Sequence, residues 1–248
     1  MALYVIADLH LSNPPNEDKS MEVFGGRWAG YMQRLEQRWR GLVTDTDTVV
    51  VAGDISWALT LPEAEQDLRF LGSLPGQKVL LRGNHDFWWG TTAKIHRFLE
   101  DKSIPTIRLL HNNAWLCEPF ILCGTRGWFH DPDLDMPPGA DYDKIVHREA
   151  ERLKISLAAA SALRESHPDC ELLAFLHFPP LWGGRVCAPI ADLLAEAGVR
   201  RCFFGHIHGV STLPGPLLYR QMSGHLVTAD HLAFLPKLIS PLSTSSEF

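Results

Sequence analysis

Five short polar segments of the chain contain residue types that bind metal ions and transfer protons. Each segment follows an apolar run, and the residues concerned are Asp8 with His10, Asp54, Asn84 with His85, His177, and His206 with His208. Carboxylate and amide oxygens bind hard cations, imidazole nitrogen binds transition metals, and histidine also transfers protons near neutral pH. Each segment alone is a weak signal, because Asp, Asn and His also occur in ordinary turns at strand ends. Their recurrence after five apolar runs predicts that they meet in one site.

The spacing within two of these segments places pairs of side chains together. Asp8 and His10 are two residues apart, and so are His206 and His208. Alternate residues of an extended chain point to the same side. The first pair therefore offers a carboxylate and an imidazole to one divalent ion, and the second pair offers two rings to adjacent ions. Asp54 follows a glycine that permits a tight turn, so its carboxylate is in a position to bridge two metals.

The other candidates supply one more oxygen, one more nitrogen and two groups for the substrate. Asn84 offers a neutral amide oxygen, and His85 is a proton-transfer group for which Asp86 or another nearby acid is a candidate partner. His177 precedes Phe-Pro-Pro, which prevents a continuing helix and leaves the ring on a loop as a third nitrogen ligand. Arg126 lies between glycines at a predicted strand end, where its guanidinium suits phosphate oxygens, although a surface arginine in a hairpin is the alternative.

Buried strands and covering helices must bring these segments together. Short apolar runs predict buried strands over residues 2–7, 48–52, 78–81, 172–176 and 201–204. Apolar residues at helical spacing and helix-start signals predict helices over residues 28–43, 61–71, 91–100, 144–164 and 188–197. Alternating strands and helices predict parallel pairing, with the polar segments at one edge of a sheet, where α/β proteins bind ligands. Closely spaced runs predict antiparallel strands over residues 107–110, 115–117 and 120–123, and over 217–238 with a turn at Ser223–Gly224.

Length and composition limit the classes of protein to consider. With 248 residues, 46% of them hydrophobic, the chain can bury a full core. We expect a single domain over residues 1–239 and a flexible, serine-rich tail over residues 240–248. The formal net charge of −6 and the lack of a basic run disfavour a stable nucleic-acid partner.

Location and redox state follow from the same composition. The five cysteines show no Cys-x-x-Cys spacing, so we expect reduced core residues. The first residues resemble a strand rather than a signal peptide, and no apolar run reaches membrane-spanning length. We therefore expect a cytoplasmic protein without a membrane partner. Nitrogen and oxygen ligands without cysteine favour manganese, iron, zinc or nickel over calcium or an iron–sulfur cluster.

The five segments together resemble the motif set of the calcineurin-like metallophosphoesterases. Asp-x-His, Gly-Asp, Gly-Asn-His-Asp, a lone His after a strand, and Gly-His-x-His occur in that family's order and rough spacing between Asp8 and His208. Within the superfamily, the chain looks like the bacterial predicted phosphohydrolases. The resemblance implies a four-layer α/β/β/α sandwich, with two mixed sheets flanked by helices and two divalent transition-metal ions.

The resemblance also implies a role for each residue. The implied ligands of the first metal are Asp8, His10 and His208. The implied ligands of the second metal are Asn84, His177 and His206. Asp54 would bridge the two ions, and His85 would contact the substrate and assist the leaving group.

The implied activity is hydrolysis of a small phosphorylated substrate, either a phosphomonoester or a phosphodiester, by attack of a metal-bridging hydroxide. Residues 55–58 differ from the motif of the protein Ser/Thr phosphatases, and Trp57 replaces the tyrosine ligand of purple acid phosphatases. Both branches are therefore disfavoured. Two alternatives stay open, namely a catalytically inactive metal-binding scaffold and a nuclease that acts on short oligonucleotides. The intact ligand set and His85 count against the scaffold, and the acidic charge balance counts against the nuclease.

Overall fold

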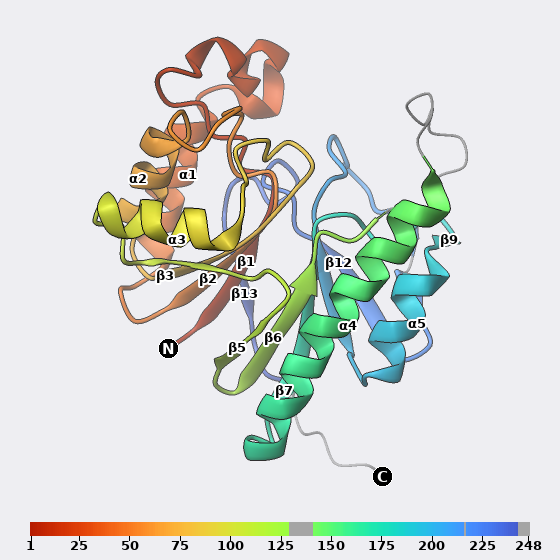
Figure 1. Cartoon of the computed structure of the whole chain (residues 1–248). Helices are drawn as coiled ribbons and strands as arrows, with labels where there is room; N and C mark the ends of the chain where they lie inside the picture. The colour runs from red at the N-terminus through yellow and green to blue at the C-terminus, as the bar shows by residue number, and fades with distance from the viewer. Residues whose placement is uncertain (129–140, 216, 243–248) are drawn as a thin grey trace.

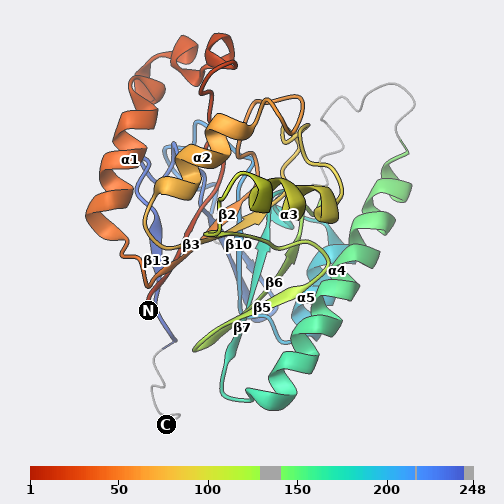
Figure 2. The ribbon, with the colours of Figure 1, turned by 60° about the vertical axis from the view of Figure 1, so that its left-hand side comes forward.

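The chain folds into four layers, with two β-sheets stacked face to face and helices on both outer faces (Figure 1). The computed structural model describes residues 1–128, 141–215 and 217–242. Helices α1 and α4 lie at opposite outer sides of the molecule in both ribbon views (Figure 2). The predicted α/β/β/α sandwich is confirmed.

The first sheet contains five strands in the order β13-β1-β2-β3-β4. Its strands are β1 Leu3–Ile6, β2 Thr48–Ala52, β3 Gln77–Leu81, β4 Ile107–Leu109 and β13 Lys237–Ile239. Strands β1 to β4 are parallel, and β13 is antiparallel to β1. Parallel neighbours need crossover connections, and these contain the helices α1 Tyr31–Leu42, α2 Glu65–Ser73 and α3 Thr92–Asp101. Three short 3-10 helices precede α1, over Glu17–Lys19, Met21–Phe24 and Gly26–Trp28.

The second sheet contains six strands in the order β11-β12-β10-β7-β6-β5. Its strands are β5 Ala114–Cys117, β6 Phe120–Thr125, β7 Glu171–Leu176, β10 Arg201–Phe204, β11 Leu218–Tyr219 and β12 Met222–Leu226. The four central strands are parallel, and the two edge strands are antiparallel to their neighbours. The outer face carries α4 Tyr142–Ser166 and α5 Ala188–Glu196. A small hairpin of β8 Leu181–Trp182 and β9 Arg185–Val186 precedes α5.

The central strands are largely apolar because both faces of each sheet are buried. In β1, Leu3 and Val5 belong to the core between the sheets, whereas Tyr4 and Ile6 belong to the core under α1, α2 and α3. Successive strand residues point to opposite faces, so one apolar run supplies both cores. The five cysteines are free thiols, as predicted, and four of them are buried.

The two sheets meet at the carboxyl ends of their parallel strands. The backbone N–H of Ala7 donates to the carbonyl of Val227 at 2.8 Å, and the N–H of Ala229 donates to the carbonyl of Ala7 at 2.8 Å. These bonds join the end of β1 to the end of β12. The polar segments that follow the strands of both sheets are thereby directed to one region of the molecule.

Two predicted helices begin later than the apolar spacing indicates. The first begins at Tyr31, because Gly30 has a left-handed conformation with a φ of 58° and the residues before it form a 3-10 turn. The second begins at Glu65, after a turn over residues 61–64. In both cases a residue that belongs to the buried face lies outside the regular helix, so apolar spacing alone overestimates the helix.

The pairing of two strand groups was predicted correctly only in part: β5 and β6 are antiparallel, as are β11 and β12, but the rest of each group differs. Strand β4 pairs in parallel with β3 in the first sheet, whereas β5 lies in the second sheet, so these two neighbours in sequence are not a hairpin. Ser223 and Gly224 lie inside β12, which is parallel to β10, and the turn after β11 is formed by Arg220 and Gln221. Short spacing between apolar runs cannot distinguish a hairpin from a chain that passes between sheets.

Three further expectations concern the C-terminal tail, membrane-spanning helices and the number of domains. Of the predicted flexible tail, residues 243–248 lie outside the described residues. Among the helices of the described ranges, none has the length and apolar character that a bilayer-spanning segment requires. The single-domain organisation over residues 1–239 stays a prediction.

Candidate metal centre

All five polar segments meet at the carboxyl ends of the parallel strands. Asp8, Asp54 and Asn84 follow β1, β2 and β3 of the first sheet, while His177 and His206 follow β7 and β10 of the second. The segments are linked by backbone bonds, since the N–H of Asp8 donates to the carbonyl of Gly53 at 2.9 Å. The strand ends of both sheets therefore contribute to one site, as expected from the sequence.

One group of side chains in this site contains Asp8, His10 and His208. The Nε2 atoms of His10 and His208 are 3.1 Å apart. Nε2 of His208 is 3.4 Å from Oδ1 of Asp8, and Nε2 of His10 is 3.9 Å from the same oxygen. All three offer a ligand atom within 4.8 Å of the others, which is a spacing that one metal ion accommodates.

A second group forms around His177. Its Nε2 is 2.7 Å from Oδ1 of Asn84 and 3.4 Å from Oδ2 of Asp54, while its Nδ1 is 3.1 Å from the carbonyl oxygen of Ala52. The ring of His206 lies edge-on to it, with the ring centroids 5.3 Å apart. Because the backbone carbonyl accepts a hydrogen bond from Nδ1–H, Nε2 is the ring nitrogen that faces Asp54 and Asn84.

Asp54 lies between the two groups. Its Oδ2 atom is 3.4 Å from Nε2 of His177 and 3.9 Å from Nε2 of His10. Oδ2 is also 4.0 Å from Nε2 of His85, whose side chain is 37% exposed and is thus the accessible histidine beside this carboxylate. The N–H of His85 donates to the other carboxylate oxygen at 2.8 Å, which fixes the two residues relative to each other.

Four candidate ligands have an unusual backbone conformation. The φ angles of Asp8, His10, Asp54 and His206 are 58°, 46°, 50° and 73°. Few non-glycine residues adopt positive φ, and such residues are concentrated at functional sites. Alternate spacing predicts an extended chain at Asp8 with His10 and at His206 with His208, but the backbone there is not extended. Left-handed turns directly after the strands turn the side chains into the site.

Two glycines make room for the carboxylates. A Cβ at Gly205 would lie 2.1 Å from Oδ2 of Asp8, and a Cβ at Gly83 would lie 2.1 Å from Oδ1 of Asp54. Both distances are far shorter than a van der Waals contact. The glycines of the Gly-Asn-His and Gly-His-Ile-His segments are thus explained by close packing against Asp54 and Asp8.

The site concentrates negative charge that is partly balanced by histidines. Asp8 and Asp54 are buried. Within the described ranges, neither carboxylate forms an ion pair with a lysine or arginine. Burial raises the pKa of Asp54, but the charge of His177 and its hydrogen bond lower it more, so the net pKa lies below the ordinary range. Buried carboxylates facing imidazole nitrogens, without cysteine, form a donor set that fits divalent transition metals.

Burial and the nearby carboxylates shift the pKa values of two imidazoles in opposite directions. Burial lowers the pKa of His177, but Asp54 raises it more, and the net pKa is about 9. Burial lowers the pKa of His10 to about 4 against the opposing charges of Asp54 and Asp8. Neighbouring rings with such different proton affinities are typical of functional sites.

Asp230 is a site residue that the sequence analysis missed. Its Oδ1 is 3.0 Å from Nδ1 of His208, and its Oδ2 accepts the N–H of Gly209 at 2.8 Å. A carboxylate at Nδ1 directs the Nε2 lone pair of a histidine toward a metal and increases its basicity. Asp230 follows β12 in the sequence Thr-Ala-Asp, 22 residues from His208. It belongs to none of the five segments, so no local pattern identifies it.

Asp86 has a different role from the predicted one. Its buried carboxylate accepts the N–H groups of Gly83 at 2.7 Å and Ile55 at 2.9 Å, and the indole N–H of Trp88 at 3.0 Å. Burial, followed by the charge of Asp54, raises its pKa to about 6. Asp86 therefore fastens the loop after β2 to the loop after β3, and its hydrogen bonds go to these groups rather than to the ring of His85.

Trp57 packs against two histidines of the site. Its ring stacks on His10 with a centroid distance of 4.7 Å and an interplanar angle of 21°, and it tilts against His85 at 4.6 Å. The indole therefore limits the rotation of both imidazoles.

Arg126 lies beside the His177 turn. Its carbonyl accepts the N–H groups of His177 at 3.1 Å and Phe178 at 2.9 Å, and its side chain is only 17% exposed. The surface-hairpin alternative is wrong, because β6 continues through Gly124 and Thr125 and is parallel to β7. The guanidinium donates to Glu149 at 3.1 Å. Contact with a phosphate stays a prediction.

Comparison with known protein families assigns the chain to a family. The family model described as calcineurin-like phosphoesterase matches residues 1–210. The chain belongs to the calcineurin-like phosphoesterase family. It is therefore a metal-dependent phosphoesterase. Every site residue predicted from the sequence lies within the matched range, whereas Asp230 lies beyond it.

Solved structures share the fold of this phosphoesterase. The protein TT1561 of Thermus thermophilus is 14% identical, with a TM-score of 0.53 and coverage of 97% of this chain and 99% of that one. A phosphopantetheinyl hydrolase from Mycobacterium tuberculosis is also 14% identical, with a TM-score of 0.51 and coverage of 100% and 98%. A protein of unknown function from Aquifex aeolicus is 15% identical, with a TM-score of 0.51 and coverage of 96% and 95%. A search of curated protein sequences finds no significant match.

Proposed function

We propose that this phosphoesterase holds two divalent transition-metal ions and hydrolyses a phosphomonoester or phosphodiester bond of a small substrate. The observation that carries the proposal is the position of Asp54. Its Oδ2 lies 3.4 Å from Nε2 of His177 and 3.9 Å from Nε2 of His10, so one carboxylate serves both groups of nitrogens. A carboxylate shared by two groups of ligands is the arrangement that a dinuclear site requires.

The two groups of side chains divide into two ligand sets. We assign to the first ion Asp8, His10 and His208. We assign to the second ion Asn84, His177 and His206. Asp54 is the bridging ligand. Manganese, iron, zinc and nickel all accept this mixture of imidazole, carboxylate and amide donors.

The protein residues orient the reaction around these ions. When bound, two ions neutralise the phosphoryl oxygens and supply an activated water. His85 faces the bridging carboxylate from the exposed side, with its Nε2 4.0 Å from Oδ2 of Asp54. In that position its ring would deliver a proton to the leaving oxygen of a bound ester. Trp57 packs against the ring of His85, with ring centroids 4.6 Å apart, and holds it in place.

The proposal is tested by hydrolysis assays on manganese-loaded protein with p-nitrophenyl phosphate and bis(p-nitrophenyl) phosphate. Asp54→Asn and His85→Asn should each reduce turnover by about 100-fold or more, because each removes a group that acts at the reacting centre. His96→Asn, on the exposed face of α3, is the matched control and should retain the wild-type rate. Wild-type rates in either site variant would contradict the assigned roles.

The same assay separates the alternatives. A scaffold would bind manganese and hydrolyse neither ester. A nuclease would cleave short oligonucleotides with a rate that falls steeply as salt rises, because basic side chains would have to replace counterions of the backbone. We expect hydrolysis of at least one aryl ester.

A further inference from the structure

Four arginines gather beside the metal centre, and three of them surround a single carboxylate. Arg82 follows β3, Arg126 follows β6, and Arg148 and Arg152 lie on α4. We name them the arginine cluster. The carboxylate is that of Glu149, which is fully buried.

Three of these arginines converge on one oxygen atom of Glu149. The distances to Oε1 are 2.7 Å from Nη1 of Arg152, 3.1 Å from Nη2 of Arg126 and 3.8 Å from Nε of Arg148. The other oxygen of Glu149 accepts the hydroxyl of Thr125 at 3.2 Å. Arg152 and Thr125 therefore already satisfy the buried carboxylate.

Arg82 belongs to the same group by its electrostatic effects. Burial lowers the pKa of Arg126, and the charges of Arg82, Arg148 and Arg152 lower it further against the opposing charge of Glu149. Burial and the charges of Arg152 and Arg82 also lower the pKa of His111, which follows β4. Arg82 and Arg152 thus act on the same imidazole.

The positive charge of the cluster exceeds what Glu149 balances. In the described part of the chain, Arg126, Arg148 and Arg152 have no ion pair other than the one with Glu149, and Arg82 has none. The Nε atoms of Arg82 and Arg126 are buried and have no hydrogen-bond partner there. Among the described residues, the three guanidinium groups that converge on Glu149 leave a local excess of two positive charges, and Arg82 adds a further positive charge nearby. Buried donors without acceptors are costly unless a ligand satisfies them.

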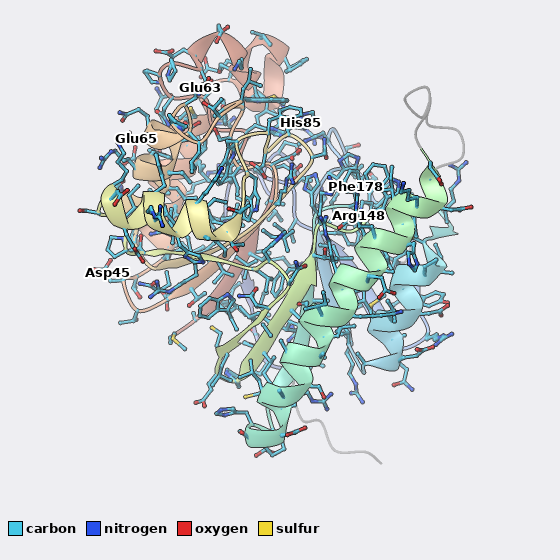
Figure 3. All side chains as sticks on the ribbon, viewed as in Figure 1. Asp45, Glu63, Glu65, His85, Arg148 and Phe178 are labelled. Carbon is cyan, nitrogen blue, oxygen red and sulfur yellow. The ribbon has the colours of Figure 1, made fainter. Side chains whose placement is uncertain are left out.

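The cluster adjoins the ligands assigned to the second metal. Arg82 is two residues before Asn84, and the carbonyl of Arg126 accepts the N–H of His177 at 3.1 Å. The guanidinium carbon of Arg126 is 6.0 Å from the ring centroid of Phe178, and that centroid is 4.2 Å from the ring centroid of His206. In the view of Figure 3, Phe178 and Arg148 are seen beside the upper half of α4, with His85 to their left.

We propose that the arginine cluster binds a second phosphate group of the substrate, so that the enzyme prefers small molecules carrying two phosphates. This inference rests on the proposed function, since it places the scissile phosphate at the metal centre. The planar guanidinium matches two phosphate oxygens at once, and it keeps its charge at any physiological pH. The side chain of Arg148 is 53% exposed, so it presents the cluster to solvent.

The test compares ligands that differ only in the second anionic group. Binding of alkane diphosphonates with two to five carbons between the phosphorus atoms is measured calorimetrically on manganese-loaded protein. The alkyl monophosphonates of the same lengths are the reference. For the best length, the second phosphonate should tighten binding by about tenfold, as expected for charge-assisted hydrogen bonds to arginine. Equal affinities for the two series would overturn the proposal.

Variants then locate the effect. Arg148→Gln and Arg82→Gln should each reduce the diphosphonate advantage by at least about threefold. Arg97→Gln, on the exposed face of α3, should leave the advantage unchanged. Arg148 is on the surface, so its variant keeps the test open if Arg82→Gln does not fold. An advantage that survives Arg148→Gln in full would contradict the assignment.

Failure of the proposed function gives a different result. In that case the monophosphonates would not bind to the manganese-loaded protein and neither aryl ester would be hydrolysed. An arginine-dependent diphosphonate affinity would then show an anion site without phosphoesterase chemistry beside it. Tight monophosphonate binding with no diphosphonate advantage would be consistent with the metal centre and would contradict only the phosphate-binding role of the arginine cluster.

Discussion

The Asp230 carboxylate determines how one histidine of the metal centre is presented. It lies 3.0 Å from Nδ1 of His208, and together with Asp8 it raises the pKa of that ring to about 10 against the effect of burial. The N–H of Gly209 holds its other oxygen at 2.8 Å. The imidazole is thereby held with Nε2 toward Asp8, which is the orientation that metal binding requires.

Asp230→Asn should therefore weaken manganese binding by about 10- to 100-fold, the usual effect of removing a carboxylate behind a metal-ligating histidine. Competition with a fluorescent chelator measures the affinity. Asp192→Asn is the matched control, because Asp192 pairs with Arg220 and Tyr219 away from the site. Equal affinities in wild type and Asp230→Asn would show that His208 does not depend on this carboxylate.

Individual site residues were predictable from the sequence where a metal-binding residue type occurs just after an apolar run. Asp8 and His177 follow an apolar run directly and Asp54 follows one after a single glycine, and the structure brings the three together. Asp230 was not predictable, because its link to His208 is a contact between two chain segments that carry no shared pattern. The left-handed turns were also missed, since alternate spacing alone suggests an extended backbone.

At the scale of the elements, the site depends on strand ends that pack without space to spare. The turn after β10 begins with Gly205, where a Cβ would lie 2.1 Å from Oδ2 of Asp8 and 2.7 Å from Cβ of Ala7. Asp8 cannot yield easily, because both of its carboxylate oxygens accept the N–H of His206, at 3.0 and 3.1 Å. The conformation of the turn after β10 therefore depends on the position of the turn after β1, and the reverse is also true.

Gly205→Ala should displace Asp8 and reduce manganese affinity by at least about tenfold, together with a loss of about 1–3 kcal/mol in the free energy of unfolding from overpacking. Titration with manganese and urea unfolding measure the two effects. Gly90→Ala is the matched control, because a Cβ there meets no atom within 4 Å. Unchanged affinity and stability in Gly205→Ala would contradict the close packing of these two turns.

Elements buried on both faces were predicted best. The runs that became β1, β2, β7 and β10 are continuous apolar segments, and such segments indicate central parallel strands. The path from β4 to β5 was not predictable, because the chain crosses from one sheet to the other within residues 110–113. Tertiary packing of the two sheets decides that step, and sequence spacing does not.

On the scale of the whole molecule, the interface between the two sheets includes a titratable side chain. The ring of His225 in β12 stacks on Phe203 of the core between the sheets, with centroids 4.9 Å apart. Burial, followed by the charges of Lys237 and Arg201, lowers its pKa from 6.5 to about 4. The folded protein therefore favours the neutral ring.

This shift makes stability depend on pH in a defined direction. Between pH 6.5 and 4 the unfolded chain binds the proton and the folded chain does not, so the free energy of unfolding should fall as pH falls through this window. Urea unfolding with a chelator present, at pH 7 and pH 5, measures the decrease. His225→Gln should show a smaller decrease than wild type, whereas His96→Gln, an exposed histidine, should not. An equal decrease in His225→Gln would contradict this origin.

The fold packs two sheets together so that carboxylates from the first sheet lie opposite histidines from the second sheet. The proposed chemistry depends on a pair of metal ions bound between these two sets of side chains. The most direct measurement is elemental analysis of the chain after metal removal, reloading with manganese and exhaustive desalting. We predict about two manganese ions per wild-type chain and no more than one per chain of Asp54→Asn, since that residue lies between both ligand groups. A wild-type chain that retains no manganese, or an Asp54→Asn chain that retains two ions, would contradict the dinuclear centre.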